Sequence, residues 1–278
     1  MGKETRAACV IGWPVEHSRS PLIHNYWLKQ HGIAGEYRRE AVRPEDFAEF
    51  LARLSERGYV GANITLPHKE AALSLSEPDE RAKAIGAANT LWREGNRLLS
   101  TNTDVEGFLA NLDASAPQWD KGLQQALVLG AGGGARAIVH GLIGRGVKNV
   151  HVANRSLARA QALRERFGPA VQPLHWEEIG GRLAAAGLLV NATSLGMSGH
   201  PPLDLRIDDL PANSVVADIV YAPLVTPLLA AARKRGLRTA DGLGMLLHQA
   251  VRGFALWFGV APQVSAELRA LVEVDLTK

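Results

Sequence analysis

Val-Leu-Gly-Ala-Gly-Gly-Gly-Ala-Arg-Ala, residues 128–137, is a strand pattern that runs into a glycine turn and the start of a helix. The stretch fits G-x-G-x-x-A, in which the first glycine makes a tight turn and the second lets the backbone approach a pyrophosphate. The first turn of the helix also offers N–H groups to phosphates. A glycine turn without a ligand is the alternative. The flanking patterns favour a dinucleotide-binding loop made of Gly130, Ala131, Gly132, Gly133, Gly134 and Ala135.

The end of the next predicted strand indicates which dinucleotide this loop binds. An NAD site has Asp or Glu about 20 residues beyond the loop, where the carboxylate holds the ribose 2′-OH. This sequence instead has Asn-Arg-Ser-Leu-Ala-Arg at residues 154–159. Guanidinium groups make charge-assisted hydrogen bonds to phosphates. A capped helix with solvated arginines is the alternative. We interpret the segment as a site for the 2′-phosphate of NADP(H), with ligands Asn154, Arg155, Ser156 and Arg159.

Apolar runs and helical patterns alternate outward from this loop, which is typical of the α/β class. We expect strands at residues 7–12, 60–65, 126–129, 149–153, near 171, 188–191 and 215–219, and a strand–helix unit over 37–58. We expect helices at residues 21–32, 103–115, from the glycine loop through 144, and at 156–167, 176–186, 227–236, 245–258 and 264–274. Ser20 is the expected N-cap before Pro21. Gly95-Asn96 between short extended segments predicts a hairpin.

A stretch of low hydrophobicity, residues 116–125, marks the expected junction between two domains. Residues 1–115 form the first predicted domain, an α/β domain that binds substrate. Residues 116–240 repeat the strand–helix unit and predict a Rossmann-type, doubly wound nucleotide domain. Residues 241–278 contain two helical patterns with no strand pattern between them, so we place them back on the first domain.

Composition and charge exclude several classes of protein. The chain has 278 residues, 46% hydrophobic and 21% charged, which is typical of a globular rather than a disordered protein. The single cysteine, Cys9, excludes an internal disulfide. The net charge is +3 without any block of five like charges, so we do not expect nucleic acid as a partner. No apolar run approaches the roughly 18 residues of a membrane helix, and the N-terminus has no signal-peptide core, so we expect a cytoplasmic protein.

Polar side chains collect where the strands of the first domain are expected to end. Ser18 and Ser20 follow the first strand, and residues 63–69, Asn-Ile-Thr-Leu-Pro-His-Lys, close the third. Asn89 opens the hairpin, and residues 102–104, Asn-Thr-Asp, end it. Ligands of α/β sheets bind beyond the carboxyl ends of strands. Each residue alone has a second interpretation as a helix cap or a surface side chain. Together they predict a site for a polyhydroxylated small molecule.

The same segments resemble the shikimate dehydrogenase family. The matching motifs are Ser18–Asn25, Asn63–Lys69, Asn102–Gly107, Gly130–Ala135, Asn154–Arg159, Asn191–Met197 and Asp241–Gln249, in order along nearly the whole chain. The resemblance implies NADPH-dependent, reversible reduction of 3-dehydroshikimate to shikimate, on the route to chorismate and the aromatic amino acids. It also implies a substrate domain built from both chain ends around a central NADP domain.

The resemblance also implies roles for individual residues. The implied ligands of the shikimate hydroxyls and carboxylate are Ser18, Ser20, Thr65, Lys69, Asn89, Asp104, Tyr221 and Gln249. Lys69 is the implied catalytic lysine, paired with Asp104, and acts as general acid in reduction and general base in oxidation. A lysine that only positions substrate is the alternative. The implied cofactor contacts outside the loop are Glu80, Thr193, Ile219, Gly242 and Met245, with Ile219 and Gly242 flanking the nicotinamide.

Two positions depart from the residues usual in the family: His68 stands for phenylalanine and Ser156 for threonine. His68 is next to Lys69 and is therefore a candidate to alter the pH profile. A quinate/shikimate dehydrogenase with broader substrate or cofactor choice is the nearest alternative function. A non-catalytic NADP(H)-binding regulator would need the glycine loop but not Lys69 with Asp104. We expect no metal, and we leave the oligomeric state open, with a homodimer as one alternative.

Overall fold

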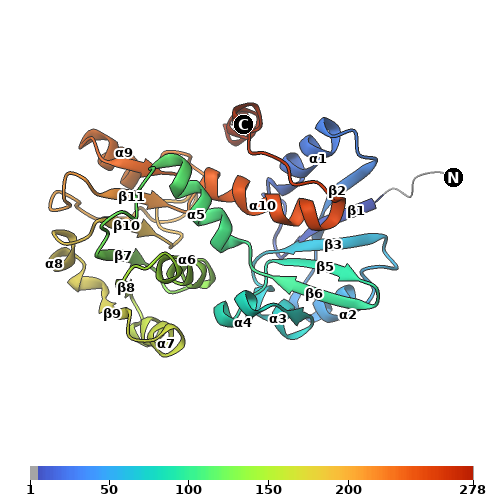
Figure 1. The fold of residues 1–278 in the computed structure, drawn as a ribbon, viewed down its shortest axis with the longest axis horizontal. Coiled ribbons are helices and arrows are strands. Elements are labelled where there is room, and N and C mark those ends of the chain that lie inside the picture. The colour runs from blue at the N-terminus through green and yellow to red at the C-terminus, as the bar shows by residue number, and fades with distance from the viewer. Residues whose placement is uncertain (1–5, 278) are drawn as a thin grey trace. The chain divides into compact units, whose positions relative to one another are not determined.

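The computed structural model describes residues 6–277, and contacts within it divide the chain into two compact units (Figure 1). Unit 1 contains the chain up to Thr103 together with Gln249–Asp275. Unit 2 contains Asp104–His248. Each unit is built on a six-stranded sheet with helices packed against it, so the predicted α/β class is confirmed.

The elements of unit 1 come mostly from the first part of the chain. Its strands are β1 (Arg6–Gly12), β2 (Gly35–Ala41), β3 (Tyr59–Ile64), β4 (Glu77–Pro78), β5 (Thr90–Glu94) and β6 (Arg97–Thr101). Its helices are α1 (Ser20–Gln30), α2 (Phe47–Ala52), α3 (Lys69–Ser74), α4 (Glu80–Ile85) and α11 (Ala266–Leu276). Helix α10 (Gly242–Phe258) is shared, with its residues from Gln249 onward in unit 1.

Unit 2 contains the remaining elements. Its strands are β7 (Gln125–Leu129), β8 (Asn149–Asn154), β9 (Val171–His175), β10 (Leu188–Asn191), β11 (Val215–Asp218) and β12 (Arg238–Ala240). Its helices are α5 (Asp104–Ser115), α6 (Gly133–Gly144), α7 (Leu157–Phe167), α8 (Gly180–Leu183) and α9 (Pro227–Lys234). Across residues 6–277, no helix combines the length and the apolarity that crossing a lipid bilayer requires.

The sheet of unit 2 is wholly parallel, with strand order β12-β11-β10-β7-β8-β9. Alternate residues of β7 enter two different cores. Ala126 and Val128 pack in the core that includes α5, α6 and α7, whereas Leu127 and Leu129 pack in the core that includes α8 and α9. Helices therefore cover both faces, which explains the continuous apolar runs of these strands. Strand β7 has β8, the next strand in the sequence, on one side and β10 on the other, so the strand order reverses at β7. The loop after β7 therefore lies at the topological switch point, where sheets of this kind bind ligands.

The sheet of unit 1 is mixed, with strand order β2-β1-β3-β5-β6-β4. Strands β1, β2 and β3 are parallel, whereas β5 runs antiparallel to both β3 and β6. Asn63 near the end of β3 is in register with Thr90 at the start of β5, and Thr90 with Thr101 at the end of β6. The loops that follow β1, β3 and β6 and the loop that precedes β5 consequently lie at one edge of the sheet, called the site edge below.

One face of the unit 1 sheet carries a cluster of buried aromatic rings from α1, β2 and α10. Its members are His24, Trp27, Tyr37, Phe254 and Trp257. The His24 ring is fully buried and stacks on Tyr37, with ring centroids 4.1 Å apart and 10° between the planes. Among residues 6–277 neither ring nitrogen of His24 has a hydrogen-bond partner. Burial lowers the pKa of His24 from 6.5 to about 3, an effect that the Asn63 side chain opposes in part.

This buried histidine predicts loss of stability in acid. Between pH 6.5 and 3, His24 is protonated in the unfolded chain but stays neutral in the folded protein. Its contribution to the free energy of unfolding is therefore complete above pH 6.5 and is lost as the pH falls toward 3. At pH 5, about 1.5 units below the ordinary pKa, the loss is about 2 kcal/mol at roughly 1.36 kcal/mol per unit. Urea unfolding at pH 7.5 and 5.0 should show this loss in the wild type and not in His24→Phe.

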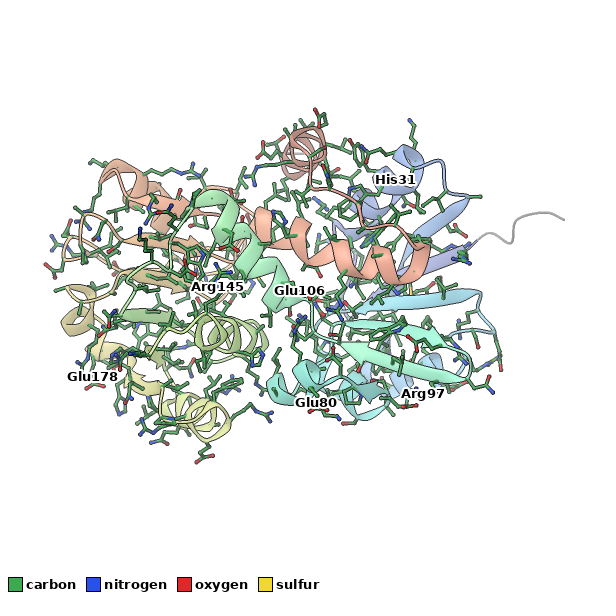
Figure 2. All side chains as sticks on the ribbon, in the orientation of Figure 1. His31, Glu80, Arg97, Glu106, Arg145 and Glu178 are labelled. Atoms are coloured by element: carbon green, nitrogen blue, oxygen red, sulfur yellow. The ribbon has the colours of Figure 1, made fainter. Side chains whose placement is uncertain are left out.

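His31→Phe is the matched control, because His31 lies at the end of the same helix with its side chain exposed (Figure 2). It should leave the acid-induced loss of stability unchanged. A His24→Phe variant that loses as much unfolding free energy between the two pH values as the wild type does would contradict the assignment.

Short elements are where the structure differs from the sequence expectations. The sequence does not predict α3, α4, β4 or β12, because elements of two to six residues show no usable periodicity. Residues 176–186, expected as one helix, form a 3₁₀ turn at Trp176–Glu178 and the four-residue α8. Ser20 is the first residue of α1 rather than its N-cap, which is Arg19. The hairpin with Gly95-Asn96 between β5 and β6 is confirmed.

The boundaries of the two contact units differ from those of the predicted domains. Helix α5 and residues 242–248 of α10 cluster with unit 2, whereas the sequence places 1–115 and 241–278 together. A cluster of contacts is not a test of which residues bind which ligand. The functional division into 1–115, 116–240 and 241–278 therefore stays a prediction.

Candidate active site

Buried polar side chains at the site edge of unit 1 form one hydrogen-bonded network. Asn63, Asn89, Thr90 and Thr103 come from β3, the start of β5 and the segment after β6, and all four are buried. Asn63 Nδ2 donates to the Asn89 carbonyl oxygen at 3.3 Å and to Thr90 Oγ1 at 3.2 Å. The hydroxyl oxygens of Thr90 and Thr103 are 3.1 Å apart. The antiparallel run of β5 and β6 thus joins segments that are far apart in the sequence.

Asn89, a predicted substrate ligand, has an amide whose orientation is set by this network. Its Oδ1 accepts from the Thr103 backbone N–H at 2.7 Å and lies 3.2 Å from the hydroxyls of both Thr90 and Thr103. The amide oxygen therefore accepts hydrogen bonds from the protein. The group that Asn89 can offer a ligand is its amide nitrogen, which is a donor. Thr103 Oγ1 also lies 3.4 Å from Gln249 Oε1, so α10 brings Gln249 to the same edge.

The loop after β1 carries Ser18 and Ser20. Ser18 is half-buried and Ser20 is buried, and Ser18 Oγ accepts from the Ser20 backbone N–H at 3.3 Å. Arg39 of β2 donates from Nε at 3.0 Å and from Nη2 at 2.7 Å to the Ser18 carbonyl oxygen. Two bonds from one rigid guanidinium fork hold the backbone of the loop beside β2.

Lys69 begins α3 and is half-buried. The turn that leads to it is tied to the sheet, since the Thr65 N–H donates to β1 at 2.9 Å and the His68 N–H donates to the Thr65 carbonyl at 3.0 Å. The Lys69 carbonyl accepts from the Ala88 N–H at 2.9 Å, one residue before Asn89. Backbone bonds therefore place Thr65, Lys69 and Asn89 at one edge.

The His68 ring packs in the core beneath this turn. It is buried, stacks on Phe47 with centroids 4.3 Å apart and 5° between planes, and has Nε2 2.7 Å from the Val42 carbonyl oxygen. A carbonyl only accepts, so Nε2 is the donor. A phenylalanine would repeat the stacking but leave the Val42 carbonyl without this donor. An effect of His68 on the pH profile stays a prediction.

The glycine loop of unit 2 has the conformation that its sequence predicts. Gly130 has φ +103°, and a Cβ there would lie 2.9 Å from the Ala192 carbonyl oxygen. A Cβ at Gly132 or Gly133 would meet no atom within 4 Å, so the backbone is open to a ligand at both positions. Gly132 is the N-cap of α6 and supplies no side-chain cap, which leaves the first N–H groups of the helix to a ligand or to water.

The residues implied to flank the nicotinamide come together in unit 2. A Cβ at Gly134 would lie 2.9 Å from Ile219 Cδ1. A Cβ at Gly242 would lie 2.4 Å from the Ile219 carbonyl oxygen and 2.5 Å from that of Val220. Only glycine permits this close approach, so the first turn of α10 lies directly on the Ile219-Val220 backbone. Met245, one turn further on, is half-buried against the same core.

A buried network, of which the sequence assigns only Thr193, holds the ends of β10 and β11. Asn191 Nδ2 donates to Asp218 Oδ1 at 3.0 Å, and Asp218 also accepts from the Val220 N–H at 3.0 Å and from Thr226 Oγ1 at 2.7 Å. Burial raises the pKa of Asp218, and these three hydrogen bonds oppose the rise. The Thr193 hydroxyl donates to Asn191 Oδ1 at 2.7 Å. The signal for Asn191 and Asp218 is a polar residue that ends a wholly apolar strand.

The end of β8 carries the predicted ligands of the 2′-phosphate. Asn154 Nδ2 donates to the Ser156 carbonyl at 2.9 Å. Ser156 is the N-cap of α7, yet its hydroxyl makes no cap bond, so the alternative of a serine-capped helix is not what forms. Arg155, Ser156 and Arg159 are exposed. Within residues 6–277, no carboxylate lies within 4.0 Å of the guanidinium of Arg155 or Arg159.

Several predicted pairings join residues of different units and stay predictions. Lys69 belongs to unit 1 and Asp104 to unit 2, where it begins α5; Tyr221 likewise belongs to unit 2. Glu80, the implied cofactor contact in unit 1, begins α4 (Figure 2). It forms an ion pair with Lys83 at 2.7 Å, and its side chain is 91% exposed. No group of three His, Cys, Asp or Glu in the described part of the chain is arranged to hold a metal ion.

Comparison with known proteins places the chain in a family. Residues 10–91 match the shikimate dehydrogenase substrate binding domain, residues 116–198 the shikimate / quinate 5-dehydrogenase model, and residues 242–271 the shikimate 5′-dehydrogenase C-terminal domain. The chain belongs to the shikimate dehydrogenase family. The shikimate dehydrogenase (NADP(+)) of Nitrobacter hamburgensis is 67% identical over 271 residues, which cover 98% of this chain and 95% of that protein. That of Rhodopseudomonas palustris is 65% identical over 276 residues, 99% of each chain.

Solved structures of the shikimate dehydrogenase family share the fold along the whole chain. A shikimate 5-dehydrogenase from Thermus thermophilus, in complex with NADP(H) and shikimate, has a TM-score of 0.83 and 36% identity, with 98% of each chain covered. A quinate dehydrogenase from Corynebacterium glutamicum, in complex with NAD, has a TM-score of 0.90 and 33% identity, with 97% of this chain and 99% of that chain covered. The resemblance read from the sequence motifs is confirmed.

Proposed function

We propose that this protein is an NADP(H)-dependent oxidoreductase that interconverts 3-dehydroshikimate and shikimate, on the route to chorismate and the aromatic amino acids. Relatives named shikimate dehydrogenase (NADP(+)), 62–67% identical over nearly the whole chain, support the reaction and the cofactor. The observation that carries the proposal is the site edge of unit 1. There a backbone bond ties Lys69 to Ala88, one residue before Asn89, and hydrogen bonds fix the Asn89 amide and the Thr103 hydroxyl, which suits a substrate with several hydroxyl groups.

The residues of unit 2 fit NADP(H). The open backbone at Gly132 and Gly133, ahead of the uncapped start of α6, suits the pyrophosphate. Arg155 and Arg159, with no carboxylate partner in the described chain, suit the 2′-phosphate. Ile219, held beneath Gly242, provides an apolar surface for the nicotinamide. When bound, NADPH supplies the hydride that adds to the ketone carbon.

In the proposed reduction, the chain's own residues hold the substrate and Lys69 supplies the proton. Lys69 as an ammonium stabilises the negative charge that develops on the carbonyl oxygen and then donates a proton to it. Oxidation runs in reverse, with neutral Lys69 as the base. Asp104 orients Lys69 and accepts a hydrogen bond from a ring hydroxyl. The proposed holders of the other hydroxyls and the carboxylate are Ser18, Ser20, Thr65, Asn89, Tyr221 and Gln249.

An absorbance assay at the nicotinamide band tests this function directly. Shikimate and quinate are each offered with NADP⁺ and with NAD⁺, and shikimate with NADP⁺ should give the highest kcat/KM. Quinate with NAD⁺ is the second candidate, favoured by the similarity to a quinate dehydrogenase bound to NAD. Purified protein that oxidises shikimate with neither cofactor would contradict the proposal.

Asp104→Asn and Gln249→Ala are expected to weaken shikimate binding roughly tenfold or more. Each change leaves a polar group of the substrate or the site without its partner, which costs about 1–3 kcal/mol. Asp104→Asn should also lower kcat, because it removes the charge that orients Lys69. Calorimetric titration with shikimate, alongside thermal melting, measures both effects.

Asp113→Asn is the control for these variants, since Asp113 lies on α5 as Asp104 does but pairs with Arg145 at 2.5 Å. It should leave shikimate affinity unchanged. Unaltered affinity in both Asp104→Asn and Gln249→Ala would mean that these two residues serve only the fold.

We also propose that the protein works in the cytoplasm, and we keep a homodimer as one alternative for its oligomeric state. A chain whose one cysteine, Cys9, is a free and buried thiol suits a reducing compartment. Fractionation of cells that produce the tagged protein tests the location. Light scattering on the purified protein measures its mass in solution, and a mass of 29.9 kDa would contradict the dimer.

A further inference from the structure

We propose that Asp275, in the last turn of α11, is a positioning residue for the substrate site and acts through Arg19. The proposal rests on the proposed function, because it concerns how the loop that carries Ser18 is held for shikimate. Arg19 Nε and Asp275 Oδ2 form an ion pair at 2.7 Å, and both residues belong to unit 1. Asp275 lies beyond residues 242–271, which the C-terminal family model matches, and neither residue has an assigned role in binding or chemistry.

The position of Asp275 on α11 places its carboxylate on the inner face of the helix. Leu268 and Val272 are fully buried, and Asp275 follows them at the i, i+4, i+7 spacing of one helix face. A carboxylate on the buried face of a helix needs a partner of opposite charge, because desolvation opposes its charged form. Arg19 is that partner, with its side chain 24% exposed and that of Asp275 34% exposed.

A second contact joins the segments that carry the two residues. Trp27, fully buried on α1, donates from Nε1 to the Gln263 carbonyl oxygen at 3.2 Å, three residues before α11 begins. Arg19 is the N-cap of α1 and makes no cap bond with its side chain. Its Nε is buried and meets no well-aligned hydrogen-bond acceptor within residues 6–277, so the Asp275 carboxylate balances its charge through the ion pair.

Arg19 and Arg39 hold two consecutive carbonyl groups of the loop that carries Ser18. Arg19 Nη1 donates to the His17 carbonyl oxygen at 3.3 Å, and Arg39 donates twice to the Ser18 carbonyl oxygen. These two carbonyls belong to the peptide planes on either side of Ser18, so the bonds fix its backbone dihedrals. Ser18 Oγ accepts from the Ser20 N–H, which uses the oxygen, and the hydroxyl hydrogen can be donated to a ligand.

The two arginines differ in what anchors them. Arg39 lies in β2, whose backbone is fixed by the ladder with β1. Arg19 lies next to the loop that it stabilises, so its bond to the His17 carbonyl fixes the loop only if the guanidinium is held from outside. Asp275 supplies this external anchor. Loss of the carboxylate should therefore loosen one side of the loop while Arg39 still holds the other, which weakens substrate binding without abolishing it.

Asp275→Asn keeps the shape of the side chain and removes its charge. We expect the KM for shikimate to rise about three- to fivefold, as a partly exposed ion pair allows, with kcat and the KM for NADP⁺ within about 1.5-fold. Shikimate is an anion, so the loss of a negative charge from the protein would by itself favour binding. A rise in KM has the opposite sign to this general effect. Asp275→Glu keeps the charge and should restore most of the affinity.

Glu273→Gln is the matched control. Glu273 lies on the same helix and pairs with Arg269 at 2.8 Å, and its side chain is 37% exposed, close to that of Asp275. The variant removes the same charge from a pair of similar exposure that does not reach the loop of Ser18. It should leave the KM for shikimate unchanged or slightly lower.

A double-mutant cycle tests whether Asp275 acts through Arg19. Arg19→Met keeps an unbranched stem but removes the guanidinium, and it should raise the KM for shikimate at least as much as Asp275→Asn does. In the Arg19→Met background there is no charge to anchor, so adding Asp275→Asn should change this KM by less than about 1.5-fold. A helix end that serves only stability would instead give effects that multiply.

The outcomes separate this proposal from the function on which it rests. A wild type that oxidises shikimate with neither cofactor overturns the proposed function and the positioning role together. An active wild type with an unchanged KM for shikimate in Asp275→Asn overturns the positioning role alone. An equal rise in Glu273→Gln, or multiplication of the two effects in the cycle, does the same. An unchanged KM in Arg19→Met overturns it equally when Asp275→Asn cannot be obtained folded.

Discussion

Lys69→Ala should lower kcat for shikimate oxidation by roughly 10²–10⁴-fold, the usual contribution of a positioned acid–base group. Backbone bonds fix the Lys69 main chain on both sides, through the turn at Thr65 and through the Ala88 N–H, so removal of the side chain leaves the site edge in place. The KM for NADP⁺ should stay within about twofold, because the glycine loop belongs to unit 2. Steady-state kinetics with both substrates varied measures kcat, the KM for shikimate and the KM for NADP⁺.

Lys29→Ala controls for the loss of one positive charge, since Lys29 is exposed in the last turn of α1 and away from the site edge. It should leave kcat unchanged. If Lys69 only positions substrate, Lys69→Ala would raise the KM for shikimate strongly and lower kcat little. A loss in kcat of less than fivefold would remove Lys69 from the proton transfer.

The sequence predicts most of unit 2, because local patterns encode its parts. The apolar runs that become β7, β8, β10 and β11 are buried on both faces, and Gly130 has the positive φ that the turn requires. Each such feature depends on neighbours within a few residues. The three-residue β12 is missed because its pairing with β11, rather than its own composition, makes it a strand.

Unit 1 is harder to predict, because its site depends on pairing between distant segments. Asn63 and Asn89 are 26 residues apart, and only the antiparallel run of β5 brings them together. Tyr37 of β2 reaches Asn63 of β3 across β1, a contact that is invisible before the register is known. Sequence motifs therefore identify the residues of the site edge but not the network that orients them.

Local sequence is equally limited as a predictor of what single polar residues bond. Ser20 has the sequence context of an N-cap, yet it lies inside α1 with its side chain buried. Ser156 is an N-cap, yet its hydroxyl makes no cap bond. A serine before a helix can hydrogen-bond either the free backbone N–H groups of the helix or a ligand. The neighbouring residues in the sequence do not determine which of the two it bonds.

A strong preference for NADP⁺ over NAD⁺ should follow from the end of β8, carried mainly by Arg155 with Arg159 assisting. A hydrogen bond to a charged group is worth about 1.5–3 kcal/mol. Two such contacts, weakened because both arginines are exposed, should give roughly 10²–10³-fold discrimination at about 1.4 kcal/mol per tenfold. No carboxylate in residues 6–277 competes for either guanidinium, so neither has to leave an ion pair to bind a phosphate.

Arg155→Ala should raise the KM for NADP⁺ and leave NAD⁺-dependent activity almost unchanged, because NAD⁺ has no 2′-phosphate. The ratio of the two kcat/KM values should therefore fall at least tenfold. Arg206→Ala removes an equal charge from a side chain of unit 2 that is 91% exposed, so it measures how much of the effect is general attraction of an anion. A ratio that falls equally in both variants, or by less than tenfold in Arg155→Ala, would contradict recognition of the 2′-phosphate by Arg155. Repeating the comparison at higher salt adds a second criterion, since a direct contact in the site is screened less than long-range attraction.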